Sequence, residues 1–457
     1  MPVSAEIRAP RKFRALQLTD ADSGTKVPCQ WERADEPGHV RLLWLLDQLP
    51  AGEEKRYRLS FVKRSREQRG TGVALKQVEP GSVEIRIGGQ PLGTYRCGQD
   101  QPRPYVWPLI GPTGKPITRA YPMEKDVPGE TTDHVHHRSF WFAFGAVNGV
   151  DFWGEAKHCG RIVHRRFEAL ESGPVMGRIR TSNDWIGPDG EKIIEDVREL
   201  RVYNTTDPRV MDFEITVIAS EGPVVLGDTK EGMMAFRVAS SMDVKRGGRI
   251  ENSRGGVNEP QTWGKRAEWC DYSGSVEGET VGIAILDHPD NFRHPTYWMV
   301  RNYGLFAANP FGVRIFTGDQ TRDGSHTIPA GERLTFKYRI YLHRGNAGDA
   351  KIADRWDNYV NPPNVAVTAS QGEARGEGGF DPKVPDGYEL VFQEDFGPGA
   401  TDRWEERSGS QWRIEESGEG KAYHLLKGGP PGNVRAPFGY SILEDREVGD
   451  FALLVRA

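Results

Sequence analysis

Residues 334–343 read LTFKYRIYLH, and this stretch decides the fold. Apolar or aromatic side chains occupy every second position, and most of the positions between them are polar. A period of two with one apolar face is typical of a half-buried antiparallel strand. The same alternation occurs at 211–219, 83–87 and 57–61. These segments, far apart along the chain, predict an all-β protein.

Turn signals divide the chain in a way that agrees with this prediction. The sequences GPDG at 187–190 and NTTDP at 204–208 separate three strand-like stretches, which predicts a meander across 175–219. The apolar spacing over 349–359 predicts one short helix. We therefore expect a large antiparallel β-sandwich domain over residues 1–360.

The last hundred residues change in character. Residues 361–386 are rich in proline, glycine and charge, which predicts a linker. A second domain is expected over 387–457, with strands at 389–392 and 451–455. About 70 residues are few for a sandwich domain, so we expect a truncated jelly-roll.

Composition excludes several classes of protein. The 457 residues carry a formal net charge of -5, without the basic excess of a typical nucleic-acid-binding protein. No apolar run approaches the roughly 18 residues of a membrane helix, so membrane insertion is not expected. The first ten residues lack the apolar core of a signal peptide. The protein is then cytoplasmic, or periplasmic or secreted if a signal peptide has been removed.

The densest group of ionisable residues is DHVHHR at 133–138, where three of the eleven histidines occur within four positions. On a strand, His134 and His136 would share one face and His137 would point to the other. His134 and His136 then suit a divalent metal with a carboxylate as further ligand. The imidazoles equally suit proton transfer near neutral pH, or the structural role of a polar turn.

Other segments supply further candidates. For acid–base catalysis we expect the three histidines to act with Glu155, Lys230 and Glu231, although the last two also fit a solvated turn. Arg301 suits a carboxylate or a pair of hydroxyls, or else a structural ion pair. The side chains expected to bind a substrate are polar or aromatic groups from several segments: Arg138, Trp153, His164, Asp228, His294, Trp298, Arg301 and Asn309.

Five segments between residues 103 and 345 resemble a known family. The run GETTDHVHHRSFWFAFGAVNGVDFWGE at 129–155 resembles the bacterial PmoA-like family, as do 103–122, 227–238, 294–312 and 328–345. The resemblance implies a β-sandwich of the galactose-mutarotase kind, from a family found among carbohydrate-related genes. The family's label of methane oxygenase implies copper, although this chain has no copper site in evidence beyond the histidines.

The tail carries a second resemblance. Residues 388–418 and 450–457 look like the start of a concanavalin/laminin-G-like jelly-roll, the fold of keto-disaccharide hydrolase domains. The match covers only the opening strands and supplies no catalytic residue.

Together these observations predict a carbohydrate-active protein. The first hypothesis is an enzyme that acts on a sugar or (keto-)glycoside by hydrolysis, elimination or epimerisation, through His/Glu acid–base chemistry or with a metal. No cofactor is required by this hypothesis, and a divalent metal stays open. The alternative is a carbohydrate-binding protein without catalysis. A copper oxygenase is a third and weaker hypothesis.

Overall fold

The computed structural model describes residues 1–9, 13–47, 49–50, 52–62 and 72–370, together with 404–406, 412–417, 420–425, 441–443 and 450–456. The chain divides into two compact units. Unit 1 holds residues 1–3 and 66–363, and unit 2 holds 4–65 and 364–457. Each unit is described by itself.

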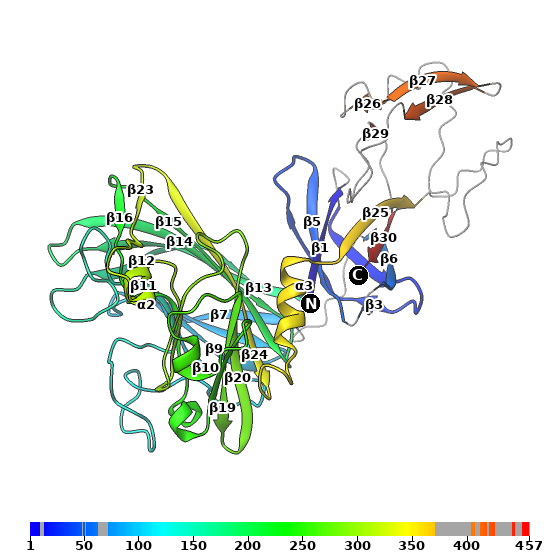
Figure 1. Ribbon diagram of the computed structural model, residues 1–457. Helices are drawn as coiled ribbons and strands as arrows, with labels where there is room; N and C mark the ends of the chain where they lie inside the picture. Colours follow the sequence, from blue (N-terminus) through cyan, green and yellow to red (C-terminus); the bar gives the residue numbers. More distant parts are fainter. Residues whose placement is uncertain are drawn as a thin grey trace. The chain divides into compact units, whose positions relative to one another are not determined.

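Two eight-stranded antiparallel sheets build unit 1 (Figure 1). The first sheet has the order β21-β22-β17-β11-β10-β9-β8-β7. Its strands are β7 (Val73–Glu79), β8 (Ser82–Ile87), β9 (Gln90–Arg96), β10 (Tyr105–Leu109), β11 (Phe140–Phe144), β17 (Gly232–Arg237), β21 (Trp298–Val300) and β22 (Leu305–Ala308).

The second sheet has the order β12-β13-β14-β15-β24-β20-β19-β18 and contains the longest strands. Its strands are β12 (Arg161–Glu171), β13 (Met176–Ile186), β14 (Lys192–Tyr203), β15 (Arg209–Ile218), β18 (Arg249–Asn252), β19 (Trp269–Val276), β20 (Glu279–Asp287) and β24 (Arg333–Arg344). The predicted meander is confirmed as β13, β14 and β15. Residues 334–343 lie within β24, which pairs with β15 and β20.

The core of unit 1 lies between the two sheets. Phe140 on β11 packs edge-on against Phe213 on β15, with ring centroids 5.3 Å apart. Phe142 approaches Trp185 on β13 at 6.3 Å. Because side chains alternate along a strand, Trp141 projects from the opposite face of the first sheet. The prediction of an all-β fold with large antiparallel sheets is confirmed.

Short elements complete unit 1. They are the paired strands β16 (Val224–Leu226) and β23 (His326–Ile328), the 3-10 turns η1 (Ser240–Met242) and η2 (Val244–Arg246), and the helices α1 (Asn258–Thr262), α2 (Val313–Thr317) and α3 (Ile352–Val360). Helix α3 confirms the helix predicted over 349–359. Among the described residues, no helix combines the length and the apolar character needed to cross a bilayer.

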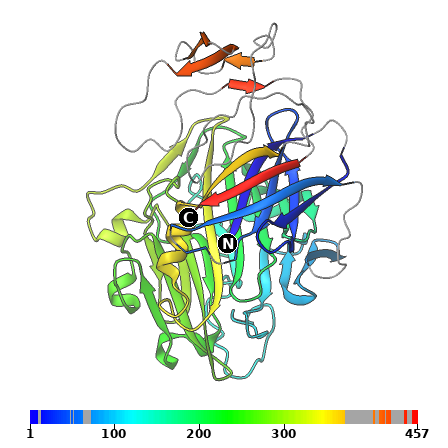
Figure 2. The ribbon, with the colours of Figure 1, turned by 90° about the vertical axis from the view of Figure 1, so that its right-hand side faces the viewer.

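Unit 2 joins strands from both ends of the sequence (Figure 2). One sheet has the order β25-β30-β6-β2-β3 and another the order β1-β5-β4. The strands are β1 (Pro2–Arg8), β2 (Ala15–Asp20), β3 (Lys26–Val27), β4 (Cys29–Arg33), β5 (His39–Leu45), β6 (Glu54–Val62), β25 (Asn364–Ser370) and β30 (Asp450–Arg456). Two further pairs are β26 (Trp404–Glu406) with β29 (Ser441–Leu443), and β27 (Trp412–Ser417) with β28 (Gly420–Leu425).

This grouping differs from the domain bounds expected from the sequence. Residues 4–65 were expected in the same domain as the large sandwich, but β6 pairs with β30, from the far end of the chain. The start of the expected linker, at 364–370, is strand β25, because its backbone pairs with β30. The rest of the expected linker, 371–386, and the expected strand at 389–392 lie outside the described residues.

Candidate functional site

Residues 133–138 form a turn, which we call the histidine turn. The backbone N–H of His137 donates to the carbonyl of His134 at 3.0 Å, and His134 has a left-handed φ of 45°. The strand β11 begins only at Phe140. The condition of a strand with His134 and His136 on one face is therefore not met, and the open alternative of a polar turn describes the local structure, because the chain turns at these histidines.

Strand pairing brings two distant segments to the histidine turn. β11 runs antiparallel to β17, so the segment before Phe140 lies beside the end of β17, where the Arg237 N–H donates to the carbonyl of Ser139 at 2.8 Å. β17 in turn pairs with β22, which places Leu305 opposite Arg237 and Tyr303 close by. The register of two strand pairs thus places the histidine turn, Arg237 and Tyr303 together, at one end of the neighbouring strands β11, β17 and β22.

Aromatic and imidazole rings stack at this edge. The His134 ring lies parallel to the rings of His137 and Tyr303, at centroid distances of 4.7 and 5.1 Å. The His137 ring stacks on Trp141 at 5.4 Å, and Trp141 contacts Trp153 at 5.1 Å. His137, Trp141 and Trp153 are buried, whereas the side chain of His134 is 41% exposed. Solvent therefore reaches the row of rings at His134.

A carboxylate and two guanidinium groups hold the histidine turn in place. The Oδ1 atom of Asp133 accepts from Nη1 of Arg119 at 2.6 Å and from Nη2 of Arg237 at 2.7 Å. Arg119 also donates to the carbonyl of His134 at 3.0 Å. Burial opposes ionisation of Asp133, but Arg237, His134 and Arg119 together lower its pKa. Asp133 is therefore a stable carboxylate at neutral pH.

Arg237 also fixes the tautomer of His137. Its Nη1 atom lies 3.0 Å from Nδ1 of His137. Because a guanidinium only donates, Nδ1 must accept, and the imidazole proton is on Nε2. Burial, His136 and Arg237 hold the pKa of His137 well below its usual value. His137 is therefore a neutral N–H donor.

A second arginine pair holds the following segment. Arg138 binds Glu155 through both carboxylate oxygens, each at 2.8 Å. Arg103, which is fully buried, donates to the carbonyl of Gly154 at 2.7 Å and to that of His136 at 3.4 Å. Burial and the positive charge of Arg103 lower the pKa of His136 to about 4. His136 is thus a second neutral imidazole at pH 7.

Three buried polar atoms around the histidine turn have no hydrogen-bond partner among the described residues. They are Nε of Arg103 and the indole Nε1 atoms of Trp141 and Trp153. All three are donors. An unpaired buried donor is costly, and the protein covers all three of these atoms.

Most of the other sequence candidates make their hydrogen bonds outside the histidine turn, although the charge of Glu231 contributes to raising the pKa of Tyr303, after burial as the main cause. Lys230 and Glu231 form an ion pair with each other. They precede Gly232, which pairs with Phe144 at the far end of β11 and β17. The carboxylate of Asp228 accepts from the backbone N–H groups of Arg314 and Gly324 at 3.0 and 2.6 Å. Asp228 therefore anchors loops.

The segment 294–309 contributes two side chains to the site, Tyr303 and Arg301. Arg301 lies over Tyr303, 5.6 Å from its ring centroid, and pairs with Glu259 at 2.9 Å. Trp298 is fully buried and donates to the carbonyl of Ala267, so its expected role as a sugar platform does not fit its position. A sugar cannot stack on a ring that the protein core covers.

Three more candidates are held in local contacts. Nδ1 of His294 lies 2.7 Å from Oδ2 of Asp287. Asn309 is buried and donates to the carbonyl of Thr229 at 3.0 Å. His164 belongs to β12 in the second sheet, where burial lowers its pKa. These side chains support the fold around them and do not meet the histidine turn.

Sequence reasoning missed Arg103, Arg119, Arg237, Trp141 and Tyr303. One signal was available for Arg237, because it follows the apolar run MMAF at 233–236 and a charge inside such a strand needs a partner. The metal site predicted at His134 and His136 finds no third ligand. Within the described ranges, no three His, Cys, Asp or Glu side chains lie close enough together to hold an ion. The rings of His134 and His136 lie 5.8 Å apart at 78°.

Comparison with known proteins gives a family match and a likeness to a solved structure. Residues 82–357 match the model of a family of unknown function, DUF6807. Among solved structures, a galactose mutarotase-like protein from Clostridium acetobutylicum is similar with 9% identity and a TM-score of 0.26, over 65% of this chain and 99% of that chain. A likeness this weak supports no argument about function. No curated protein matches the chain.

The family match corrects the resemblances drawn from the sequence. Membership of the PmoA-like family is wrong, as is the match of the tail to a keto-disaccharide hydrolase domain, because only DUF6807 is found. The matched region includes the histidine turn, Arg237 and Tyr303. This chain therefore belongs to DUF6807, a family of unknown function.

Proposed function

We propose that the protein is carbohydrate-active, and that it binds and transforms a sugar or glycoside at the histidine turn. The observation that carries the proposal is the row of parallel rings from Tyr303 through His134 to His137, held beside buried guanidinium groups. Carbohydrate ligands combine apolar C–H faces with many oxygens. A site that joins flat rings to fixed N–H donors suits both features.

The accessible part of the site has the chemistry to orient such a ligand. His134 and Asp133 are each 41% exposed, and Tyr303 and Arg301 lie next to them. The ring faces would pack against the sugar, while Arg301 and the imidazole nitrogens meet its hydroxyl groups.

The histidines supply the proposed acid–base chemistry. His137 is neutral and presents its proton on Nε2, so it can polarise a carbonyl or glycosidic oxygen by donation. His136 is also neutral, and its ring nitrogens bond to no described residue, but its pKa of about 4 makes it a weak base that would take a proton only as the reaction proceeds. A proton moved at carbon or at a glycosidic oxygen serves epimerisation, elimination or hydrolysis alike.

One observation favours the second candidate function, sugar binding without turnover. Glycoside hydrolysis commonly uses two carboxyl groups, one of which protonates the leaving group. Here Asp133 is held by Arg119 and Arg237, and Glu155 is held by Arg138. Because these guanidinium groups lower the pKa of Asp133, this carboxylate is a poor proton donor.

The test compares binding and turnover in the same variants. His136→Ala and His137→Gln should abolish turnover of glycosides by the full chain, and His137→Gln should also weaken sugar binding. His158→Ala is the matched control, because His158 is an exposed histidine outside the histidine turn. Binding without turnover in the wild type would favour the second candidate. Unchanged binding and turnover in both variants would remove the histidine turn from the function.

A further inference from the structure

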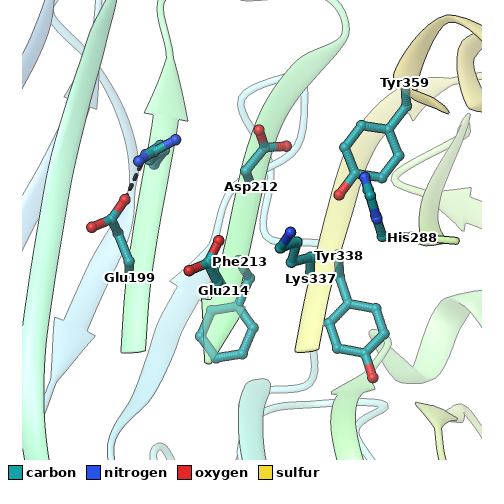
Figure 3. Close-up of a pocket in the computed structure, with 9 residues that line it drawn as sticks. Glu199, Asp212, Phe213, Glu214, His288, Lys337, Tyr338 and Tyr359 are labelled. Carbon is teal, nitrogen blue, oxygen red and sulfur yellow. Dashed lines mark ion pairs between the residues drawn. The ribbon is translucent and has the colours of Figure 1, made fainter. Parts of the chain in front are cut away.

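A cavity of about 200 Å³ lies in unit 1, away from the histidine turn (Figure 3). It opens over β14, β15 and β24 of the second sheet, and is bordered by Tyr359 of α3 and by His288, which follows β20. Its acidic and basic lining residues are Glu199, Arg201, Asp212, Glu214 and Lys337. None of the residues that line this cavity belongs to the histidine turn.

The register of three strands brings the charges together on the outer face of the sheet. Glu214 lies directly opposite Glu199 on β14 and Lys337 on β24. Its neighbour Phe213 points into the core and packs against Phe140. Because side chains alternate along β15, Glu214 and Asp212 point outwards, as Figure 3 shows.

Two of the three carboxylates are already bound by the protein. Glu199 accepts from Nε of Arg178 at 2.9 Å and from Nη1 of Arg180 at 3.1 Å. Asp212 accepts two hydrogen bonds from Arg339, at 2.6 and 2.8 Å. The negative charges of Glu199 and Asp212 are therefore compensated by arginines of the same sheet, and both side chains are held in place.

Three lining groups keep hydrogen-bonding capacity towards the cavity. The Glu214 carboxylate and the Tyr359 hydroxyl have no hydrogen-bond partner in the part of the chain that the structure describes. Nδ1 of His288 accepts the backbone N–H of Asp290 at 3.1 Å, so the imidazole proton is on Nε2. The cavity thus offers an acceptor, an N–H donor and a hydroxyl that does both.

Charge and size together select the ligand class. A cation would be attracted by Glu214 and opposed by Lys337 and Arg201, which are partly compensated because they pair with Asp290 and Glu199. An anion would be repelled by Glu214 and attracted by the same two cations. A neutral ligand with several hydroxyl groups can donate to Glu214 and accept from His288. The volume of about 200 Å³ lies below the roughly 300–1,000 Å³ of pockets for drug-sized molecules.

We propose that this cavity binds one neutral, polyhydroxylated molecule of the size of a single sugar ring. The site is separate from the histidine turn, so it would hold such a molecule whether or not the histidine turn acts on carbohydrate. Its recognition rests on Glu214, Tyr359 and His288, which come from β15, α3 and the loop after β20.

Saturation-transfer NMR on the full chain tests the proposal with methyl α-D-glucopyranoside and myo-inositol as neutral probes. Glucuronate and glucosamine are the charged probes. We expect saturation transfer to at least one neutral probe, with weaker transfer to both charged ones. The shape-conserving variants Glu214→Gln and Tyr359→Phe should each raise the Kd about three- to tenfold, as for the loss or weakening of one hydrogen bond.

Glu221→Gln is the matched control, because Glu221 is an exposed carboxylate that pairs with Lys192 and does not line the cavity. His136→Ala should also leave this binding unchanged. The proposal is overturned if neither neutral probe binds, or if a charged probe binds more tightly than both. It is equally overturned if binding is lost in His136→Ala but kept in Glu214→Gln, which would assign the ligand to the histidine turn.

Discussion

Nη1 of Arg237 lies 3.0 Å from Nδ1 of His137, although 100 positions separate the two residues in the sequence. The same guanidinium holds Asp133 at 2.7 Å, and its carbon lies 4.8 Å from the ring centroid of Tyr303. Arg237, at the end of β17, therefore holds the Asp133 carboxylate, fixes the tautomer of His137 and contacts the ring of Tyr303. Burial lowers the pKa of Arg237 to about 10, which leaves it charged at neutral pH.

Replacing this guanidinium should cost stability and change the tautomer of His137. In Arg237→Met, Asp133 loses one of its two arginine partners and Nδ1 of His137 loses its donor. We expect the free energy of unfolding to fall by about 2–4 kcal/mol, because buried groups are left unpaired. Urea unfolding measures the loss, and ¹⁵N chemical shifts of the imidazole report the tautomer. An imidazole that keeps its Nε2–H form with the same stability would contradict the assigned role.

The two neutral histidines predict how stability depends on pH. The folded-state pKa of His136 is about 4 and that of His137 is well below the ordinary 6.5. Between pH 6.5 and 4 the unfolded chain binds more protons at these positions, so their contribution to stability is complete above about pH 6.5 and is lost as the pH falls. For His136, which is partly exposed, the loss is on the order of 1–2 kcal/mol.

Comparison with His136→Gln isolates this contribution from the other titrating groups. The variant should lose less stability than the wild type between pH 7 and pH 4.5, as measured by urea unfolding at each pH. Parallel curves for the two proteins would show that the pKa of His136 is not lowered in the folded state. His39→Gln is a suitable control, because His39 lies in unit 2 and its side chain is partly exposed.

Much of the fold followed from periodicity, because alternation is a local property of the chain. The pattern at 334–343 predicted β24. The turn sequences at 187–190 and 204–208 predicted where β13 and β14 end and where β14 and β15 begin. The grouping of residues 4–65 with β30 did not follow, because antiparallel pairing across about 390 positions leaves no local signal. Alternation shows that β6 is a strand but not which strand it joins.

The candidate site was predictable only in part. The clustering of histidines pointed to the right segment, but the turn at His134 was missed because a left-handed non-glycine residue has no strong sequence signature. Arg119 and Arg237 act through contacts that depend on the register of β11 with β17. Trp298 was expected at the site because of its residue type, yet the packing around β21 covers it.

A glycine in the second sheet makes room for a buried ion pair. A Cβ added to Gly282 would lie 2.4 Å from Cε1 and 2.6 Å from Nε2 of His343. That nitrogen bonds Oδ2 of Asp271 at 2.6 Å, and both side chains are buried. Gly282→Ala should therefore lower the free energy of unfolding by about 2–4 kcal/mol through overpacking and a disturbed ion pair. Gly348→Ala, which meets only Asn346 at 3.2 Å, should change stability little. Equal stabilities of the two variants would show that the ring of His343 moves aside at no cost.

The last prediction concerns whether Glu155 acts in catalysis or in structure. Both of its oxygens bond to Arg138 at 2.8 Å, and Oε1 lies 3.6 Å from Nη2 of the buried Arg103. Glu155→Gln removes a charge that compensates two arginines in a half-buried setting. We expect it to lower the free energy of unfolding by about 1–3 kcal/mol, as measured by urea unfolding.

Glu279→Gln provides the comparison, because Glu279 is 52% exposed and its ion pair within the described part of the chain is with the exposed Arg344. Loss of a surface pair should cost no more than about 0.5–1 kcal/mol. If Glu155→Gln instead matched the wild type in stability while losing all turnover, Glu155 would be a catalytic residue. A loss of stability with sugar binding weakened in proportion would establish that it positions the segment that carries Arg138 and Trp153.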